Sequence, residues 1–147
     1  MGSFFQFGKI ALVVSLMGIA PACSKQAVLE KSVESAIIAN NETVNVLDAL
    51  QSSLRNRRQA VMEHIAKTVN SKEEGIRELD AVDERYKPLV KAFLNIETAQ
   101  EQLANGLELA KSSVLAGNNP NIEHLLLLYS QIQQMYNGIM SAMAKLD

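Results

Sequence analysis

Apolar residues recur at alternating spacings of three and four along most of the chain after residue 25. This spacing places them on one face of an α-helix and predicts three amphipathic helices, over roughly 25–69, 72–116 and 120–146. The stripe of the second predicted helix comprises Leu79, Val82, Tyr86, Leu89, Phe93, Ile96, Gln100, Leu103, Leu107, Ala110 and Val114. Only Gln100 interrupts it, so this helix has a nearly continuous apolar face.

The other two predicted helices differ in how regular their stripes are. The third has an unbroken stripe of Ile122, Leu125, Tyr129, Ile132, Tyr136, Ile139, Met143 and Leu146. The first has a mixed stripe of Ile37, Asn40, Val44, Leu47, Gln51, Leu54, Arg58, Val61 and Ile65. Its polar members make the buried face of the first helix less distinct.

Two short polar segments mark the helix ends. Ser71 and Glu74 match a capping box, in which a serine precedes the helix and a glutamate occupies its third position. Gly117 suits the end of a helix, and Pro120 suits the first turn of the next one. Turns this short join antiparallel neighbours.

The predicted fold is therefore all-α, an elongated antiparallel three-helix bundle or coiled-coil-like hairpin with a shorter third helix. The low content of glycine and proline, 7 and 3 residues, agrees with it. Asn40-Asn41 could bend the first helix, and Pro88 should kink the second because proline lacks the backbone N–H. A runner-up architecture folds the chain back at Pro88 into a shorter bundle of four or five helices.

A hairpin that closes near residue 70 fixes which charged residues face each other. The expected pairs are Lys67 with Glu74, Arg58 with Asp83, and Arg57 with Glu84. Their complementary charges favour this register, although an exposed pair contributes only about 0–1 kcal/mol.

The same register brings polar stripe residues together. Gln100 faces Asn41 and lies close to Asn40, and the second turn brings it near Tyr136 or Asn137. We expect Asn40 or Asn41, Gln100 and Tyr136 to form a buried layer with mutual hydrogen bonds.

Charge excludes one class of partner and suggests another. All 16 acidic residues and 13 of the 14 basic ones follow residue 22, so residues 23–147 have a net charge of about −3 and are not expected to bind nucleic acid. Basic residues around the first turn, among them Arg55, Arg57, Arg58 and Lys72, could bind an acidic partner. Acidic residues are interleaved with them, so a solvated, salt-bridged surface explains the same pattern.

Four consecutive leucines occupy residues 125–128. Leu127 and Leu128 lie off the apolar stripe and could contact a partner, a second protomer or a membrane surface. A helix that is buried on most sides would explain them equally well.

The first 22 residues have a different pattern. A start with one Lys and no acid precedes an apolar run, residues 10–20, which leads into Ala20-Pro21-Ala22. These features are typical of a secretory signal peptide. The run is shorter than the about 20 residues that span a membrane, so a retained anchor is the second interpretation. We expect residues 1–22 to be removed and residues 23–147 to form one exported helical domain.

The stretch IAPACSK, residues 19–25, contains the only cysteine. It resembles the lipobox of bacterial lipoproteins: Ala22 is the small residue before the obligatory Cys23, although Ala20 replaces the usual Leu and Pro21 is atypical. The resemblance covers the signal peptide alone. It implies that Cys23 receives a diacylglyceryl thioether and becomes an acylated N-terminus, and two or more acyl chains anchor a protein stably. Ordinary cleavage after Ala22 would instead leave Cys23 as an unpaired thiol.

We therefore expect a non-enzymatic, cofactor-free lipoprotein of the bacterial cell envelope that binds another protein or a second copy of itself. Scaffold, assembly accessory, and exclusion or immunity protein are compatible tasks. Ser24 resembles the signal for sorting to the outer membrane of a Gram-negative cell. One alternative is a metal-binding or enzymatic bundle that brings together Glu63-His64 and Glu123-His124, which lack the i, i+3 or i+4 spacing of helical ligands. Another is a membrane-active protein that acts through the apolar third helix.

Overall fold

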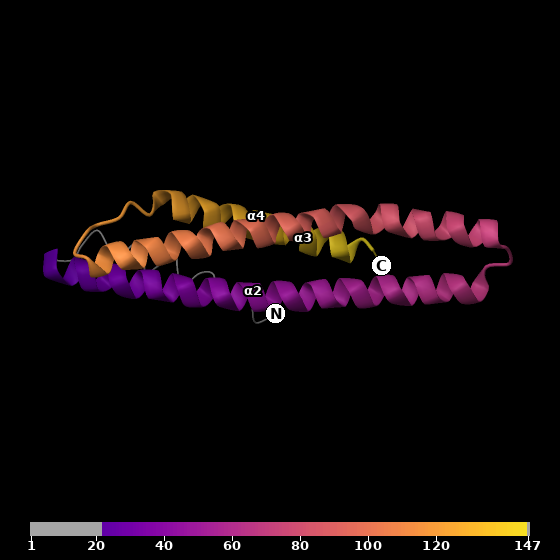
Figure 1. The fold of residues 1–147 in the computed structure, drawn as a ribbon, viewed down its shortest axis with the longest axis horizontal. Coiled ribbons are helices and arrows are strands. Elements are labelled where there is room, and N and C mark those ends of the chain that lie inside the picture. The colour runs from indigo at the N-terminus through magenta and orange to yellow at the C-terminus, as the bar shows by residue number, and fades with distance from the viewer. Residues whose placement is uncertain (1–21, 147) are drawn as a thin grey trace. The chain divides into compact units, whose positions relative to one another are not determined.

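The computed structural model describes residues 22–146, with side chains from Lys25 onward, and this part consists of three α-helices (Figure 1). They are α2 (Ala22–Thr68), α3 (Lys72–Leu115) and α4 (Glu123–Ala144), with 47, 44 and 22 residues. These residues contain no strand, so the predicted all-α fold with a shorter third helix is confirmed. The signal peptide predicted over residues 1–22 falls almost entirely outside the described residues and stays a prediction.

The helices contribute to two compact units, each with a part of all three helices. The described residues of the first unit are 22–44 and 99–132, and those of the second are 45–98 and 133–146. Within each unit α2 and α3 are antiparallel, as shown by hydrogen bonds in which higher residue numbers of α2 pair with lower residue numbers of α3. The pairs that show this are Gln26 with Val114 and Asn40 with Gln100 in the first unit, and Gln51 with Glu97 and Arg58 with Asp83 in the second.

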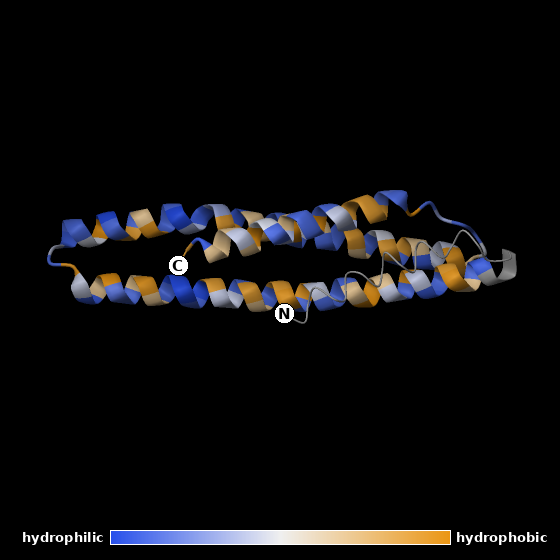
Figure 2. Ribbon diagram, turned by 180° about the vertical axis from the view of Figure 1, so that it is seen from behind, coloured by the Kyte–Doolittle hydropathy of each residue, from blue (hydrophilic) through white to orange (hydrophobic). Residues whose placement is uncertain are grey.

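Helix α3 supplies a large part of the core of both units. Its predicted stripe is buried at every position from Val82 to Val114, and only Leu79 is half-buried. The stripe of α4 also faces inward, since Leu125, Ile132 and Ile139 are buried. Figure 2 shows polar and apolar residues alternating along the helices, as amphipathic elements require. Each fully buried Leu or Ile contributes about 1.5–3 kcal/mol, so the buried stripes of α3 and α4 both stabilise the fold.

The stripe of α2 follows the prediction only in part. Leu47 and Leu54 are buried as expected, but Val44 is exposed and Thr43 is buried in its place. The Thr43 hydroxyl donates to the carbonyl oxygen of Ala39 at 2.8 Å. Because its polar group is satisfied within the helix, Thr43 can occupy the core at little cost.

The turn between α2 and α3 contains the predicted capping box. The N–H of Glu74 donates to Ser71 Oγ at 3.2 Å, which caps the start of α3. The Glu74 carboxylate accepts from the N–H of Asn70 at 3.1 Å, one residue before the usual partner. The expected pair of Lys67 with Glu74 is not among the ion pairs of the described residues.

The second turn ends α3 in a Schellman motif. Gly117 has a φ of 82°, a conformation that glycine adopts without strain. Its N–H donates to Val114 O at 2.9 Å, and the N–H of Asn118 donates to Ser113 O at 3.0 Å. Helix α4 begins at Glu123, three residues later than predicted, because Asn121 Oδ1 accepts the N–H of Glu123 and so determines the start of the helix in place of Pro120.

The predicted polar layer forms only in part. Asn40 and Gln100 are both buried, and Asn40 Nδ2 donates to the backbone oxygen of Gln100 at 3.3 Å. The expected bond between the two side chains is absent, since Gln100 Nε2 has no partner among the described residues. Asn41 is exposed, and the Tyr136 hydroxyl has no hydrogen-bond partner in this part of the chain, so neither joins the layer.

Both expected weak points lie inside continuous helices. Helix α3 passes through Pro88 and α2 passes through Asn40-Asn41. The runner-up architecture, which folds back at Pro88, is therefore wrong. A proline inside a helix lacks the backbone N–H and leaves a carbonyl oxygen one turn earlier without its donor, at a cost of about 3 kcal/mol. The buried stripe on both sides of Pro88 can offset this cost.

Gly106 of α3 and Gly138 of α4 should respond oppositely to alanine. A Cβ at Gly106 would collide with the buried side chain of Leu125, whereas a Cβ at Gly138 meets nothing within 4 Å. Overpacking costs about 1–3 kcal/mol, and replacing a helical glycine gains about 1 kcal/mol. We expect Gly138→Ala to stabilise and Gly106→Ala to be about 1–3 kcal/mol less stable than Gly138→Ala in chemical denaturation. Equal stabilities would contradict the close approach of α3 and α4.

Tyr136 should make stability depend on pH in the alkaline range. Burial raises the pKa of Tyr136 from 10.0 to about 12. Because the unfolded chain loses the phenol proton first, the contribution of Tyr136 is complete below pH 10 and is lost as pH rises through about 12. Tyr136→Phe also removes a buried unpaired hydroxyl, so we expect it to be neutral or stabilising by about 1 kcal/mol at pH 7.

The measurement is the free energy of unfolding of both proteins at several pH values from 7 to 12. Tyr136→Phe should lose less stability above pH 10 than the parent protein. Parallel curves would show that the tyrosine does not carry this dependence.

Candidate partner-binding groove

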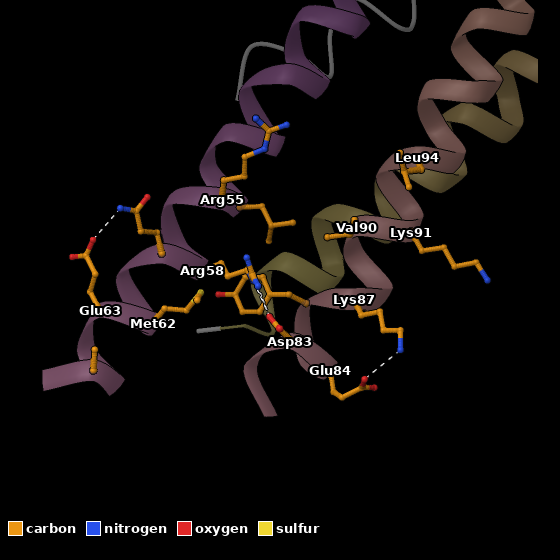
Figure 3. Close-up of a pocket in the computed structure, with 14 residues that line it drawn as sticks. Arg55, Arg58, Met62, Glu63, Asp83, Glu84, Lys87, Val90, Lys91 and Leu94 are labelled. Carbon is orange, nitrogen blue, oxygen red and sulfur yellow. Dashed lines mark hydrogen bonds and ion pairs between the residues drawn. The ribbon is translucent and has the colours of Figure 1, made fainter. Parts of the chain in front are cut away.

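The second unit has an open groove between residues 54–66 of α2 and residues 83–94 of α3 (Figure 3). Its volume is about 1180 Å³. Leu54 and Tyr86 lie in the core beneath it and are almost fully buried. The helices thus leave a hollow whose base is apolar.

Both helices present partly exposed apolar side chains to the groove. Val90 and Leu94, on α3, are 50% and 56% exposed, and Met62 on α2 is half-buried. Apolar side chains that gather in a hollow and remain in contact with water are typical of a binding surface. Closure of this groove by another molecule would remove them from water.

Charged residues surround this apolar surface. Arg58 pairs with Asp83, Lys87 pairs with Glu84, and Gln59 donates to Glu63. Figure 3 shows Arg58 and Asp83 meeting between the two helices, and Lys87 and Glu84 on the outer side of α3. Arg55 and Lys91, which also line the groove, have no ion-pair partner among the described residues. The rim therefore carries an excess of positive charge.

The groove and α4 lie on opposite sides of α3. Pro88 and Ala92 line a smaller cavity of about 190 Å³ against Ile139 of α4. Val90 and Leu94 follow them by two positions, about 200° around the helix. The helix that covers one side of the α2–α3 pair thus leaves the other side open.

The structure separates the predicted basic residues. Arg55 and Arg58 line the groove, and the predicted Arg58–Asp83 pair is confirmed. Arg57 donates instead to the backbone oxygen of Met143 in α4 at 3.5 Å, and Lys72 is exposed at the start of α3. Arg55, Arg57, Arg58 and Lys72 therefore do not form one surface, and their role in partner binding stays a prediction.

The four leucines of the first unit have different environments. Leu125 is buried, Leu126 and Leu128 are half-buried, and Leu127 is 62% exposed. The helix is thus covered on most sides, as one interpretation expected, while Leu127 remains accessible to a partner.

Two other hypotheses concern metals and the membrane. No group of three or more His, Cys, Asp or Glu side chains is arranged as a metal site within the described part of the chain. His64 and His124 are exposed and lie in different units. Among the same described residues, no helix combines the length and hydropathy needed to cross a bilayer. The side chain of Cys23 lies outside those described, so its acylation stays a prediction.

The groove itself was not predicted from the sequence. Val90 and Leu94 each follow a stripe residue, Leu89 and Phe93, by one position. An apolar residue next to the stripe widens the apolar face of a helix. That widening was the available signal, but it does not reveal which side a neighbouring helix leaves uncovered.

Comparison of the chain with protein-family models, curated proteins and solved structures finds no significant match.

Proposed function

We propose that this protein is a non-enzymatic lipoprotein of the bacterial cell envelope that acts by binding another protein. The observation that carries the binding part is the groove of the second unit, with exposed Val90 and Leu94 inside a charged rim. Protein interfaces combine an apolar centre with a polar rim in this way. Envelope scaffold, assembly accessory, and exclusion or immunity protein are tasks that such a surface can serve.

The anchoring part of the proposal is supported by the lipobox-like residues 19–25. Cleavage before Cys23 would place an acylated cysteine at the mature N-terminus, directly ahead of the side chains that the structure describes. Acyl chains would hold the protein at the membrane, and Ser24 favours the outer membrane if the cell is Gram-negative. In this proposal α2 follows the anchor without a long linker.

Intact-mass analysis tests the anchor. The purified wild-type protein should lack residues 1–22 and carry the added mass of acyl chains, and it should be recovered with membranes. Cys23→Ser should lose both the acyl mass and the membrane association, because the thioether cannot form. A wild-type protein that begins at Cys23 with an unmodified thiol would overturn this part of the proposal.

Site-specific photocrosslinking in producing cells tests the binding. A photoreactive amino acid at Leu94 should yield a discrete adduct with an envelope protein. The same amino acid at Leu109, which is 73% exposed on α3 outside the groove, is the matched control and should yield none. A further probe at Leu127 examines the second candidate surface. Absence of a discrete adduct from both Leu94 and Leu127 would contradict the proposed function.

A further inference from the structure

The α2–α3 pair of the second unit has two sides that could each hold a helix. Helix α4 occupies one side, where Ile139 and Met143 are buried. The groove occupies the other side and has no helix in it. Two antiparallel helices accept a third when its ridge of apolar side chains fits between them. The pair already packs against α4 on one side, and the groove is the surface between the same two helices that α4 leaves uncovered.

The length of the groove limits the occupant. Its lining covers residues 54–66 on α2 and 83–94 on α3. At 1.5 Å per residue each wall is about 17 Å long, which corresponds to roughly three helical turns. The Arg58–Asp83 pair shows that the two walls are offset, so a helix of three to four turns would cover the part of the groove from this pair to Val90 and Leu94.

The charged residues that line the groove determine which charge a partner helix of this length should carry. Asp83 and Glu84 are neutralised by Arg58 and Lys87, whereas Arg55 and Lys91 lack such partners among the described residues. Because α2 and α3 are antiparallel and Arg58 lies beside Asp83, Arg55 and Lys91 both lie on the side of that pair toward the Leu94 end of the groove. Acidic side chains at that end would neutralise them, and basic side chains would be repelled.

We infer that the groove binds an amphipathic α-helix of a partner protein, three to four turns long, whose apolar stripe contacts Val90 and Leu94 and whose acidic end lies beside Arg55 and Lys91. This inference rests on the proposed function of protein binding and specifies the chemistry of the partner. The apolar stripe supplies attraction, and the acidic end sets the direction in which the helix lies.

The test uses two fluorescent, side-chain-stapled helical peptides of 15 residues. Both have leucine at positions i, i+4, i+7 and i+11. One has three glutamates at one end, and the other has lysines at the same positions. The protein is used as purified from cells, in lipid nanodiscs if it carries acyl chains. Fluorescence anisotropy should show at least tenfold tighter binding of the acidic peptide.

Variants assign that binding to the groove. Leu94→Glu should weaken the acidic peptide at least tenfold, and the matched control Leu109→Glu should leave its affinity unchanged. Arg55→Glu combined with Lys91→Glu should reverse the preference toward the basic peptide. All these positions are exposed, and circular dichroism with thermal melting verifies that each variant keeps its fold.

Three results would overturn the inference. They are equal affinity for both peptides, equal effects of Leu94→Glu and Leu109→Glu, and a dimer in sedimentation that Leu94→Glu alone dissociates, which would assign the groove to a second copy of the chain. The proposed function fails separately, through an unmodified Cys23 or absent crosslinks in cells. Those results can occur whichever peptide the groove prefers.

Discussion

The apolar stripe of α3 is the constraint on which the rest of the structure depends. It is buried without interruption from Val82 to Val114, and in each unit it provides the surface on which α2 and α4 pack. A helix that serves two neighbours must approach both closely. Gly106 permits that approach, because any larger residue there would meet Leu125. The turns and caps only have to bring the other two helices onto this surface.

The groove is a consequence of the same arrangement. Helix α4 contacts α3 at Pro88 and Ala92, so the apolar residues Val90 and Leu94 face the opposite side. With three helix segments in the second unit, one side of the α2–α3 pair has no cover. Charged residues on its rim keep this side compatible with water, and their mutual pairing leaves only part of the charge available for recognition.

The features that could be predicted from the sequence are those that follow from regular residue spacing and from local chemistry. The stripe of α3, the capping box at Ser71 and the Arg58–Asp83 pair could all be predicted, because each depends on residues within one helix or on one hairpin register. The environment of Arg57 could not, since it depends on α4 reaching a carbonyl oxygen at Met143. The burial of Thr43 in place of Val44 could not be predicted either. The Thr43 hydroxyl is satisfied within its own helix, and such a hydroxyl has no distinct sequence pattern. The groove depends on the side that α4 leaves open, which no spacing within α3 specifies.

The buried contact between Asn40 and the backbone oxygen of Gln100 has a consequence for alignment in the first unit. If α2 slid by one turn along α3, the Asn40 amide would move about 5 Å from this oxygen, and a buried amide left without an acceptor costs about 1–3 kcal/mol. Leucine at the same position would tolerate many alignments almost equally. The buried Asn40 amide therefore favours one alignment of α2 and α3 in the first unit, at the cost of some hydrophobic burial.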